Sequence, residues 1–188
     1  MEQEVWLVRH GETEWSKSGQ HTSTTDLPLT PIGEEAARSL RGLFAGTSFD
    51  LVMASPRQRA RVTAELAGIT DFEIDPDLVE WDYGDYEGLT RVEVHKSRPD
   101  WSMWTHGAPN GESPEGVTAR VDRVISRLRA ADGRVLLFGH GHLTRALAAR
   151  WLGQPVSLGV HLRLDTGKLG VLGYDRGTPT LDRWNSAT

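Results

Sequence analysis

Two apolar segments of the sequence each end in a histidine followed by a glycine. Arg9-His10-Gly11 follows Val5 to Val8, and His140-Gly141 follows Val135 to Gly139. A guanidinium beside an imidazole suits a phosphate oxyanion, and a glycine lets another group approach closely. A neighbouring cation also favours the neutral imidazole, which is a good nucleophile near pH 7. The first segment alone fits equally well a core histidine beside a surface arginine.

The elements that hold these two histidines are expected to be parallel strands. Short apolar runs bounded by glycine are typical of strands buried on both faces, and here they alternate with helical patterns. This alternation predicts an α/β three-layer sandwich, with a mostly parallel central sheet, helices on both faces and room for an antiparallel edge. Because ligands of open α/β sheets bind at the carboxyl edge, we expect His10 and His140 beside one crevice.

Hydrophobic periodicity and turn residues predict the individual elements. We expect strands at 5–8, 49–54, 73–74, 134–139, 170–174 and 180–184, and helices at 31–44, 56–66, 91–96, 114–128 and 143–152. The pairs Thr30-Pro31, Ser55-Pro56 and Ser113-Pro114 are typical of an N-cap followed by proline. The buried face of the helix at 31–44 is expected to comprise Ile32, Ala36, Ala37, Leu40, Leu43 and Phe44. Segments 15–29 and 101–112 lack periodicity and are expected to be irregular.

A third strand end is expected to bring arginines to the same edge. Ser55 to Ala60 follows the strand at 49–54 and contains Arg57 and Arg59. Phosphoryl transfer depends mainly on positioning and on charge stabilisation around three equatorial oxygens, so arginines and a second histidine around a nucleophilic histidine suffice. The helix at 143–152 begins directly behind His140, so its N-terminal backbone donors are expected to face the same site.

The leaving alkoxide of such a reaction needs a general acid. Glu80 lies beside Trp81 and Tyr83, whose apolar bulk favours the protonated carboxyl. Three other carboxylates in the same segment are alternative acids: Asp82, Asp85 and Glu87.

Arg9 to Thr13 resembles the signature of the histidine phosphatase superfamily, also called the phosphoglycerate-mutase-like proteins. The resemblance continues in order through Leu27 to Gly33, Ser55 to Ala60, Glu80 to Gly88 and His140-Gly141. Within the superfamily, segments 15–20, 25–30 and 80–88 look most like actinobacterial acid phosphatases and fungal sedoheptulose-1,7-bisphosphatases. The resemblance therefore covers nearly the whole chain and implies a phosphoglycerate-mutase-like fold in a single domain, residues 1–188.

The resemblance also implies roles for five residues. His10 is the residue phosphorylated during turnover, Arg9, Arg59 and His140 surround the phosphoryl group, and Glu80 protonates the leaving group and then activates water. Among the neighbouring arginines, only Arg59 has the family's spacing before Ala60.

Further positions follow from matching the loop after the signature. The match places Ser16, the backbone of Thr22 and Ser23, and Gly141 near the phosphate or the substrate. Ser23 stands where the family often has glycine, which leaves the conformation of this loop open. His142 stands where mutases have asparagine, and its role is open. A metal site on His140 and His142 is disfavoured because alternate residues of an extended segment point in opposite directions.

These observations together predict a phosphomonoester hydrolase that acts on small phosphorylated metabolites, a sugar phosphate or bisphosphate, through a phosphohistidine. The alternatives are a cofactor-dependent phosphoglycerate mutase and a phospho-ligand-binding protein without turnover. The chain lacks room for the long insertion and extended tail of those mutases, which favours water access and hydrolysis. Candidates for reading the rest of the substrate are Lys17, Gln20, His21, Arg91, Trp104 and His106.

Composition excludes several other classes of protein. The chain has 188 residues, a net charge of −5 and no cysteine, so we expect no nucleic-acid partner, no membrane partner and no thiolate metal site. Its beginning lacks the basic and apolar regions of a signal peptide, and a cytoplasmic location is the expectation. No metal or other cofactor is expected. A homodimer through an edge strand or an exposed helix face stays open.

Overall fold

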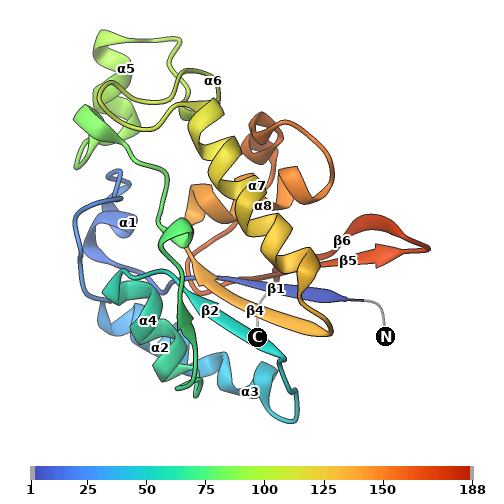
Figure 1. Ribbon diagram of the computed structural model, residues 1–188. Coiled ribbons are helices and arrows are strands. Elements are labelled where there is room, and N and C mark those ends of the chain that lie inside the picture. Colours follow the sequence, from blue (N-terminus) through green and yellow to red (C-terminus); the bar gives the residue numbers. More distant parts are fainter. Residues whose placement is uncertain (1–2, 187–188) are drawn as a thin grey trace.

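A computed structural model describes residues 3–186 and shows a three-layer α/β sandwich (Figure 1). The strands are β1 (Glu4–Arg9), β2 (Leu51–Ala54), β3 (Glu73–Ile74), β4 (Arg134–Gly139), β5 (Leu169–Asp175) and β6 (Thr178–Ser186). They form one sheet in the order β3-β2-β4-β1-β5-β6. The first four are parallel, whereas β5 and β6 are antiparallel to their neighbours. The mostly parallel sheet with an antiparallel edge is confirmed.

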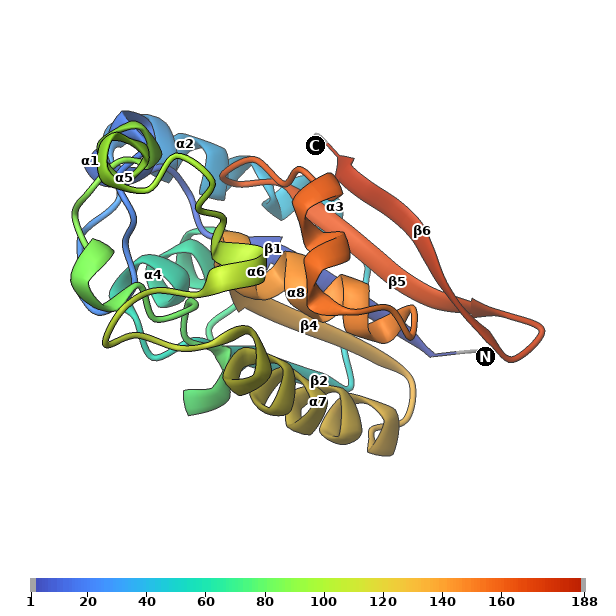
Figure 2. The same cartoon turned by 90° about the horizontal axis from the view of Figure 1, so that it is seen from above.

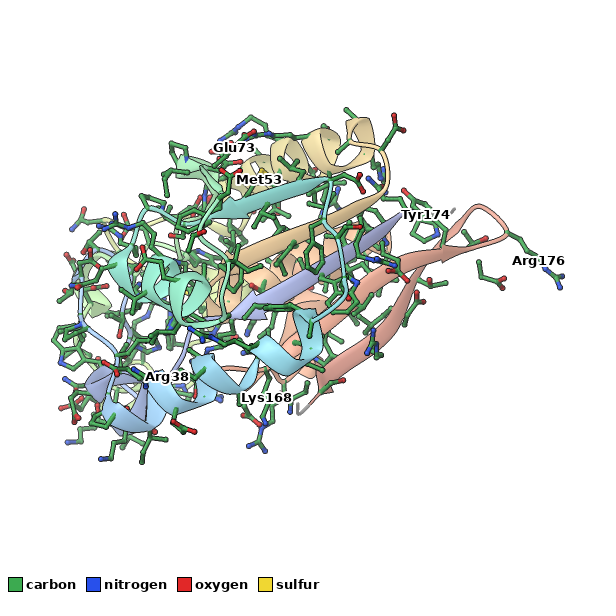
Figure 3. The ribbon with its side chains drawn as sticks, turned by 90° about the horizontal axis from the view of Figure 1, so that it is seen from below. Arg38, Met53, Glu73, Lys168, Tyr174 and Arg176 are labelled. Carbon is green, nitrogen blue, oxygen red and sulfur yellow. The ribbon has the colours of Figure 1, made fainter. Side chains whose placement is uncertain are left out.

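Helices cover both faces of this sheet. They are α1 (Glu14–Ser18), α2 (Pro31–Ser39), α3 (Arg41–Phe44), α4 (Gln58–Leu66), α5 (Arg91–Ser97), α6 (Met103–His106), α7 (Pro114–Ala130) and α8 (Gly141–Trp151), with 3-10 turns η1 (Pro76–Leu78), η2 (Gly84–Tyr86) and η3 (Val156–His161). Figure 2 shows α7 and α8 over one face, and Figure 3, from the opposite side, shows α2, α3 and α4 over the other. Among the described residues, none of the helices has the length and apolar composition needed to span a membrane.

The alternation of side chains along β1 explains why its sequence is apolar throughout. Val5 and Leu7 pack in the larger core, with α7 and α8. Trp6 and Val8 pack in the smaller core, with α3 and α4. Because successive side chains of a strand point to opposite faces, a central strand covered on both sides has no polar positions.

Two of the three expected N-caps are confirmed, and one is wrong. Thr30 caps α2 and Ser113 caps α7, each through its hydroxyl and each before a proline. By contrast, α4 begins at Gln58 and its N-terminus has no side-chain cap. The hydroxyl of Ser55 is instead 2.7 Å from Nε2 of His140. A serine before proline has the local pattern of an N-cap, but here its hydroxyl is hydrogen-bonded to a distant residue, His140.

Short helices interrupt two segments that were expected to be irregular. The segment 15–29 begins within α1, whose capping box joins Thr13 and Ser16, and 101–112 contains α6. Helices of one turn are too short to show a period of 3.6 residues, so the pattern missed them.

The helix expected at 31–44 is divided in two, α2 and α3, at Leu40. Ile32 was expected to be buried on it but is 66% exposed. Gly33 faces inward in its place, because its backbone packs so tightly on Glu12 that a Cβ would lie 2.2 Å from the Glu12 carbonyl oxygen.

The sheet order brings three carboxyl ends together. β4 lies between β2 and β1, with Gly139 opposite Arg9 and Phe138 opposite Ala54. The residues that follow these strands, His10, His140 and Ser55, therefore emerge side by side. This is the arrangement that the alternation of strands and helices predicts.

Candidate active site

His10 follows β1 and is held as one tautomer. Its Nδ1 is 2.7 Å from the carbonyl oxygen of Gly11, and the side chain is buried. A carbonyl oxygen only accepts, so Nδ1 carries the proton and donates it. Burial, followed by the charges of Arg59 and Arg9, lowers the pKa of His10 well below its ordinary range. The ring is therefore neutral near pH 7, with a lone pair on Nε2.

His140 lies against His10 at the start of α8. The two ring centroids are 5.2 Å apart. Nε2 of His140 is bonded to the Ser55 hydroxyl, and its Nδ1 is buried without a hydrogen-bond partner among residues 3–186. Burial, then the charges of Arg59 and His10, lowers the pKa of His140 well below its ordinary range. The unpartnered Nδ1 leaves one hydrogen-bonding position of this buried ring open.

Arg59 is a fully buried cation whose terminal NH1 and NH2 groups are bound by the loop at 22–25. It donates to the carbonyl oxygens of Thr25, at 2.9 Å, and of Thr22 and Ser23, each at 3.3 Å. Burial lowers its pKa, and the charge of Glu80 partly opposes that effect. Its Nε is buried without a partner in the described part of the chain. A buried donor of this kind needs an acceptor, which an anionic ligand supplies.

Arg9 presents a second such donor. Its NH1 group donates to the carbonyl oxygen of Leu164 at 2.7 Å, while its Nε is buried and has no partner within residues 3–186. Gly141 lies directly over the guanidinium, since a Cβ there would be 3.2 Å from the Arg9 Cζ. The glycine therefore gives the arginine room beside the start of α8.

The glycine after His10 has a different role from the expected one. Gly11 was interpreted as room for a ligand, but its α-carbon faces the backbone of Gly33, where a Cβ would lie 2.3 Å from the carbonyl oxygen. Its N–H donates to the Thr63 hydroxyl at 3.0 Å. Gly11 thus lets the signature pack against α2.

Glu80 is held by backbone donors. Oε1 accepts from the N–H groups of Trp81, at 2.9 Å, and Leu143, at 2.7 Å. Oε2 accepts from the N–H of His142 at 3.0 Å. The N-terminus of α8 does face the site, as expected, but its donors bind this carboxylate and hold it in the wall of the cavity.

A cavity of about 330 Å³ opens at this edge of the sheet. It is lined by six of the predicted site residues: Arg9, His10, Ser16, Thr22, Glu80 and Gly141. Arg59 and His140 are fully buried and do not line it. Ser23 is outside the lining too, with its N–H directed to Glu87. The cavity therefore brings a guanidinium, a neutral imidazole and a carboxylate around one space.

Comparison with known protein families agrees with this geometry. The family model for the histidine phosphatase superfamily (branch 1) matches residues 5–187. The chain belongs to the histidine phosphatase superfamily. Members of the superfamily act on phosphomonoesters, and the resemblance seen in the sequence motifs is confirmed.

Similar proteins include two phosphatases and a solved structure. An acid phosphatase of Mycobacterium tuberculosis is 41% identical over 179 residues, which cover 93% of this chain and 88% of the relative. A sedoheptulose 1,7-bisphosphatase of Saccharomyces cerevisiae is 40% identical, with 85% and 70% covered. The structure of an open reading frame of Mycobacterium tuberculosis superposes with a TM-score of 0.95 at 38% identity, covering 98% of each chain.

The alternative acids of this histidine phosphatase are engaged elsewhere. Glu87 accepts from the N–H groups of Ser23 and Thr25. Asp85 accepts from the Asn110 side chain, and Asp82 from the backbone of Gly84. None of these three carboxylates lines the cavity. Among the described residues, no group of three or more His, Cys, Asp or Glu is arranged to hold a metal ion.

The outer part of the cavity contains most of the residues expected to read the substrate. Gln20, His21, Arg91 and Trp104 line it, whereas Lys17 and His106 do not. Sequence reasoning missed further lining residues of this histidine phosphatase: Gly19, Tyr83, Ser102, Met103, Arg145 and Val160. Arg145 could have been found, because a residue four positions after Gly141 lies on the same helix face.

Proposed function

We propose that the protein hydrolyses small phosphorylated metabolites, sugar phosphates or bisphosphates, through a phosphohistidine on His10. One observation supports the proposal: Nδ1 of His10 is bonded to Gly11, which leaves Nε2 with its lone pair, and the residue lines the same cavity as Arg9 and Glu80. A neutral imidazole in this tautomer is a nucleophile, and the unpartnered Nε atoms of the two buried arginines supply donors to a phosphoryl group.

The first half of the reaction transfers the phosphoryl group. Nε2 of His10 forms the bond to phosphorus as the ester bond to the leaving oxygen breaks. Arg9, Arg59 and Nδ1 of His140 stabilise the three equatorial oxygens, and Glu80 gives its proton to the leaving oxygen. The alcohol departs with that proton, and Glu80 is left ionised.

The second half releases phosphate. Glu80 takes a proton from a water molecule, whose oxygen attacks phosphorus as the bond to Nε2 breaks. Inorganic phosphate leaves and His10 returns to its neutral form. Glu80 ends protonated, as it began, so the cycle balances with one water consumed.

The remaining predicted residues are assigned to substrate binding. Ser16, Thr22 and Gly141 line the cavity, which supports a role in contacting the phosphate or the organic part of the substrate. Ser23 acts through Arg59, because its carbonyl oxygen accepts from that guanidinium. Residues 1–188 form a single domain in this proposal.

The substrate class follows from the size and charge of the cavity. A volume of about 330 Å³ suits a small metabolite. Arg91 and Arg145 add positive charge to the outer wall, which suits a second anionic group. The similarity to a sedoheptulose 1,7-bisphosphatase supports a bisphosphate.

The test is phosphate release by purified protein, without added metal, from sedoheptulose 1,7-bisphosphate, fructose 1,6-bisphosphate, 3-phosphoglycerate and an aryl phosphate. We expect release, with acid-labile labelling of His10 that His10→Ala abolishes together with turnover. Phosphate shuttling between carbons without release would identify a mutase. Binding without either reaction would identify a phospho-ligand-binding protein.

A further inference from the structure

His142 forms a partly buried hydrogen bond with Tyr83 in the wall of the cavity. The Tyr83 hydroxyl is 2.5 Å from Nδ1 of His142, and Tyr83 is 3% exposed. This hydroxyl has no other hydrogen-bond partner within residues 3–186. Burial raises the pKa of Tyr83 well above its ordinary range, so the phenol keeps its proton. Because the phenol O–H has no other acceptor in this part of the chain, we assign its proton to the bond with Nδ1 of His142.

This bond determines where the imidazole carries its own proton. Burial, then the charge of Arg145, lowers the pKa of His142 well below its ordinary range, so the ring is neutral. A neutral ring that accepts at Nδ1 is protonated at Nε2. Nε2 makes no hydrogen bond to the described part of the chain, and His142 lines the cavity. The ring is held by Trp104, whose centroid is 5.0 Å away.

His21 is the second histidine that packs against Tyr83, and it is assigned the opposite tautomer. Its Nδ1 is 2.7 Å from the carbonyl oxygen of Leu89, so Nδ1 carries the proton. Burial lowers the pKa of His21, which leaves Nε2 as an acceptor. The His21 ring lies 4.7 Å from the Tyr83 ring and lines the same cavity. One imidazole thus offers a hydrogen-bond donor and the other an acceptor.

We propose that His142 and His21 form a pair that reads a hydroxyl group of the leaving alcohol, with His142 as donor and His21 as acceptor. The position of that alcohol rests on the proposed function. The backbone N–H of His142 is bonded to Glu80, the group assigned to protonate the leaving oxygen. The pair therefore lies on the leaving-group side, and the hydroxyl it reads belongs near the ester oxygen.

The proposal specifies a class of substrate. A hydroxyl both accepts and donates, so it satisfies both histidines, whereas an alkyl or aryl group satisfies neither. A site built around a hydroxyl discriminates against an analogue that lacks it, because its polar groups are then left unpaired. Phosphate esters of polyols are expected to be preferred over alkyl phosphates of the same size.

The test compares glycerol 1-phosphate with n-propyl phosphate, which differ by two hydroxyl groups. We measure kcat/KM for both esters in the wild type, His142→Phe and Tyr83→Phe. His142→Phe keeps an aromatic ring and the backbone N–H on Glu80 but removes both ring nitrogens. We expect the preference for glycerol 1-phosphate to fall about tenfold in His142→Phe, as for the loss of one hydrogen bond, and to fall in the same direction in Tyr83→Phe.

A matched control is His161→Phe, at an exposed position outside the cavity lining. It should keep the wild-type preference. An equal fall for both esters in His142→Phe would show a structural or general catalytic role and overturn the proposal. Phosphate release from aryl phosphate, measured in parallel, tests the proposed phosphatase function itself. A failure of that function can therefore be told apart from a failure of the proposed histidine pair.

A spectroscopic measurement tests the pair without turnover. Nitrogen-15 shifts of the imidazoles should show His142 protonated at Nε2 and His21 protonated at Nδ1. In Tyr83→Phe the proton of His142 should no longer be confined to Nε2, whereas His21 should stay protonated at Nδ1. Glycerol 1-phosphate added to His10→Ala should shift both Nε2 signals, and n-propyl phosphate should not. The reverse tautomer of His142 would overturn the proposal.

Discussion

Glu87 accepts hydrogen bonds from both the backbone N–H and the hydroxyl of Ser23, at 2.9 and 2.6 Å from one carboxylate oxygen. The same carboxylate accepts from the N–H of Thr25. The carbonyl oxygens of Ser23 and Thr25 in turn accept from Arg59. Glu87 therefore acts on the site through this loop, as a positioning residue for the guanidinium.

We expect Glu87→Gln to weaken the binding of anions at the site. The amide replaces one acceptor oxygen with a donor, so the loop loses at least one charge-assisted hydrogen bond and Arg59 its alignment. The inhibition constant of inorganic phosphate or vanadate should rise about tenfold. Asp85→Asn is the matched control, because it changes an exposed contact with Asn110 in the same segment. Equal effects of the two variants would contradict the role of Glu87.

Ser55→Ala should lower kcat strongly and the free energy of unfolding only slightly. The hydroxyl is bonded to Nε2 of His140, and its loss frees the ring that we propose stabilises the phosphoryl group. We expect kcat to fall about tenfold or more, with a loss of about 1 kcal/mol in the free energy of unfolding. Ser39→Ala, at an exposed hydroxyl on α2, should change neither. A normal kcat in Ser55→Ala would show that His140 needs no such support.

Arg120 is expected to stabilise the segment that leads to Glu80. Its guanidinium is paired with Glu112 and donates to the carbonyl oxygens of Asp77 and Val79, each at 2.8 Å. Arg120→Leu leaves a largely buried carboxylate unpaired and should lower the free energy of unfolding by about 3 kcal/mol. Urea unfolding measures the change. Arg123→Leu, an exposed arginine paired with Asp77, is the control and should have a much smaller effect.

The buried histidines should make the protein less stable as the pH falls. The pKa values of His10 and His140 are lowered in the folded protein, chiefly by burial. Below about pH 6.5 the unfolded chain therefore binds protons that the folded chain does not, and each histidine lowers the free energy of unfolding by up to about 1.4 kcal/mol per pH unit. Their stabilising contribution is complete above that pH and is lost as the pH falls.

Urea unfolding at pH 7.5, 6.5 and 5.5 measures this slope. His140→Gln should reduce it, because one of the two groups is gone, and His161→Gln, at an exposed position, should not. A slope that is identical in the wild type and His140→Gln would show that His140 is protonated in the folded protein. The lowered pKa of His10 also predicts that the nucleophile stays neutral in mildly acidic solution, so kcat/KM should persist below pH 6.

Local patterns were enough to predict most of the framework. Buried strands and longer helices repeat their apolar residues over a few positions, and Thr30-Pro31 and Ser113-Pro114 mark helix starts within a few residues. The errors arise because a local pattern does not report contacts with distant parts of the chain. Ser55-Pro56 has the pattern of an N-cap, yet its hydroxyl binds a histidine 85 residues further along the chain.

The sequence by itself determined the family, the sandwich and the candidate catalytic set, because the motifs and the alternation of strands and helices lie in short segments. Only the tertiary structure decided what those residues touch. It showed that the start of α8 binds Glu80, that Glu87 binds the loop around Arg59, and that His142 and His21 both contact Tyr83. The physical reason is that hydrogen bonds between distant segments depend on strand order and on side-chain direction, which no local pattern encodes.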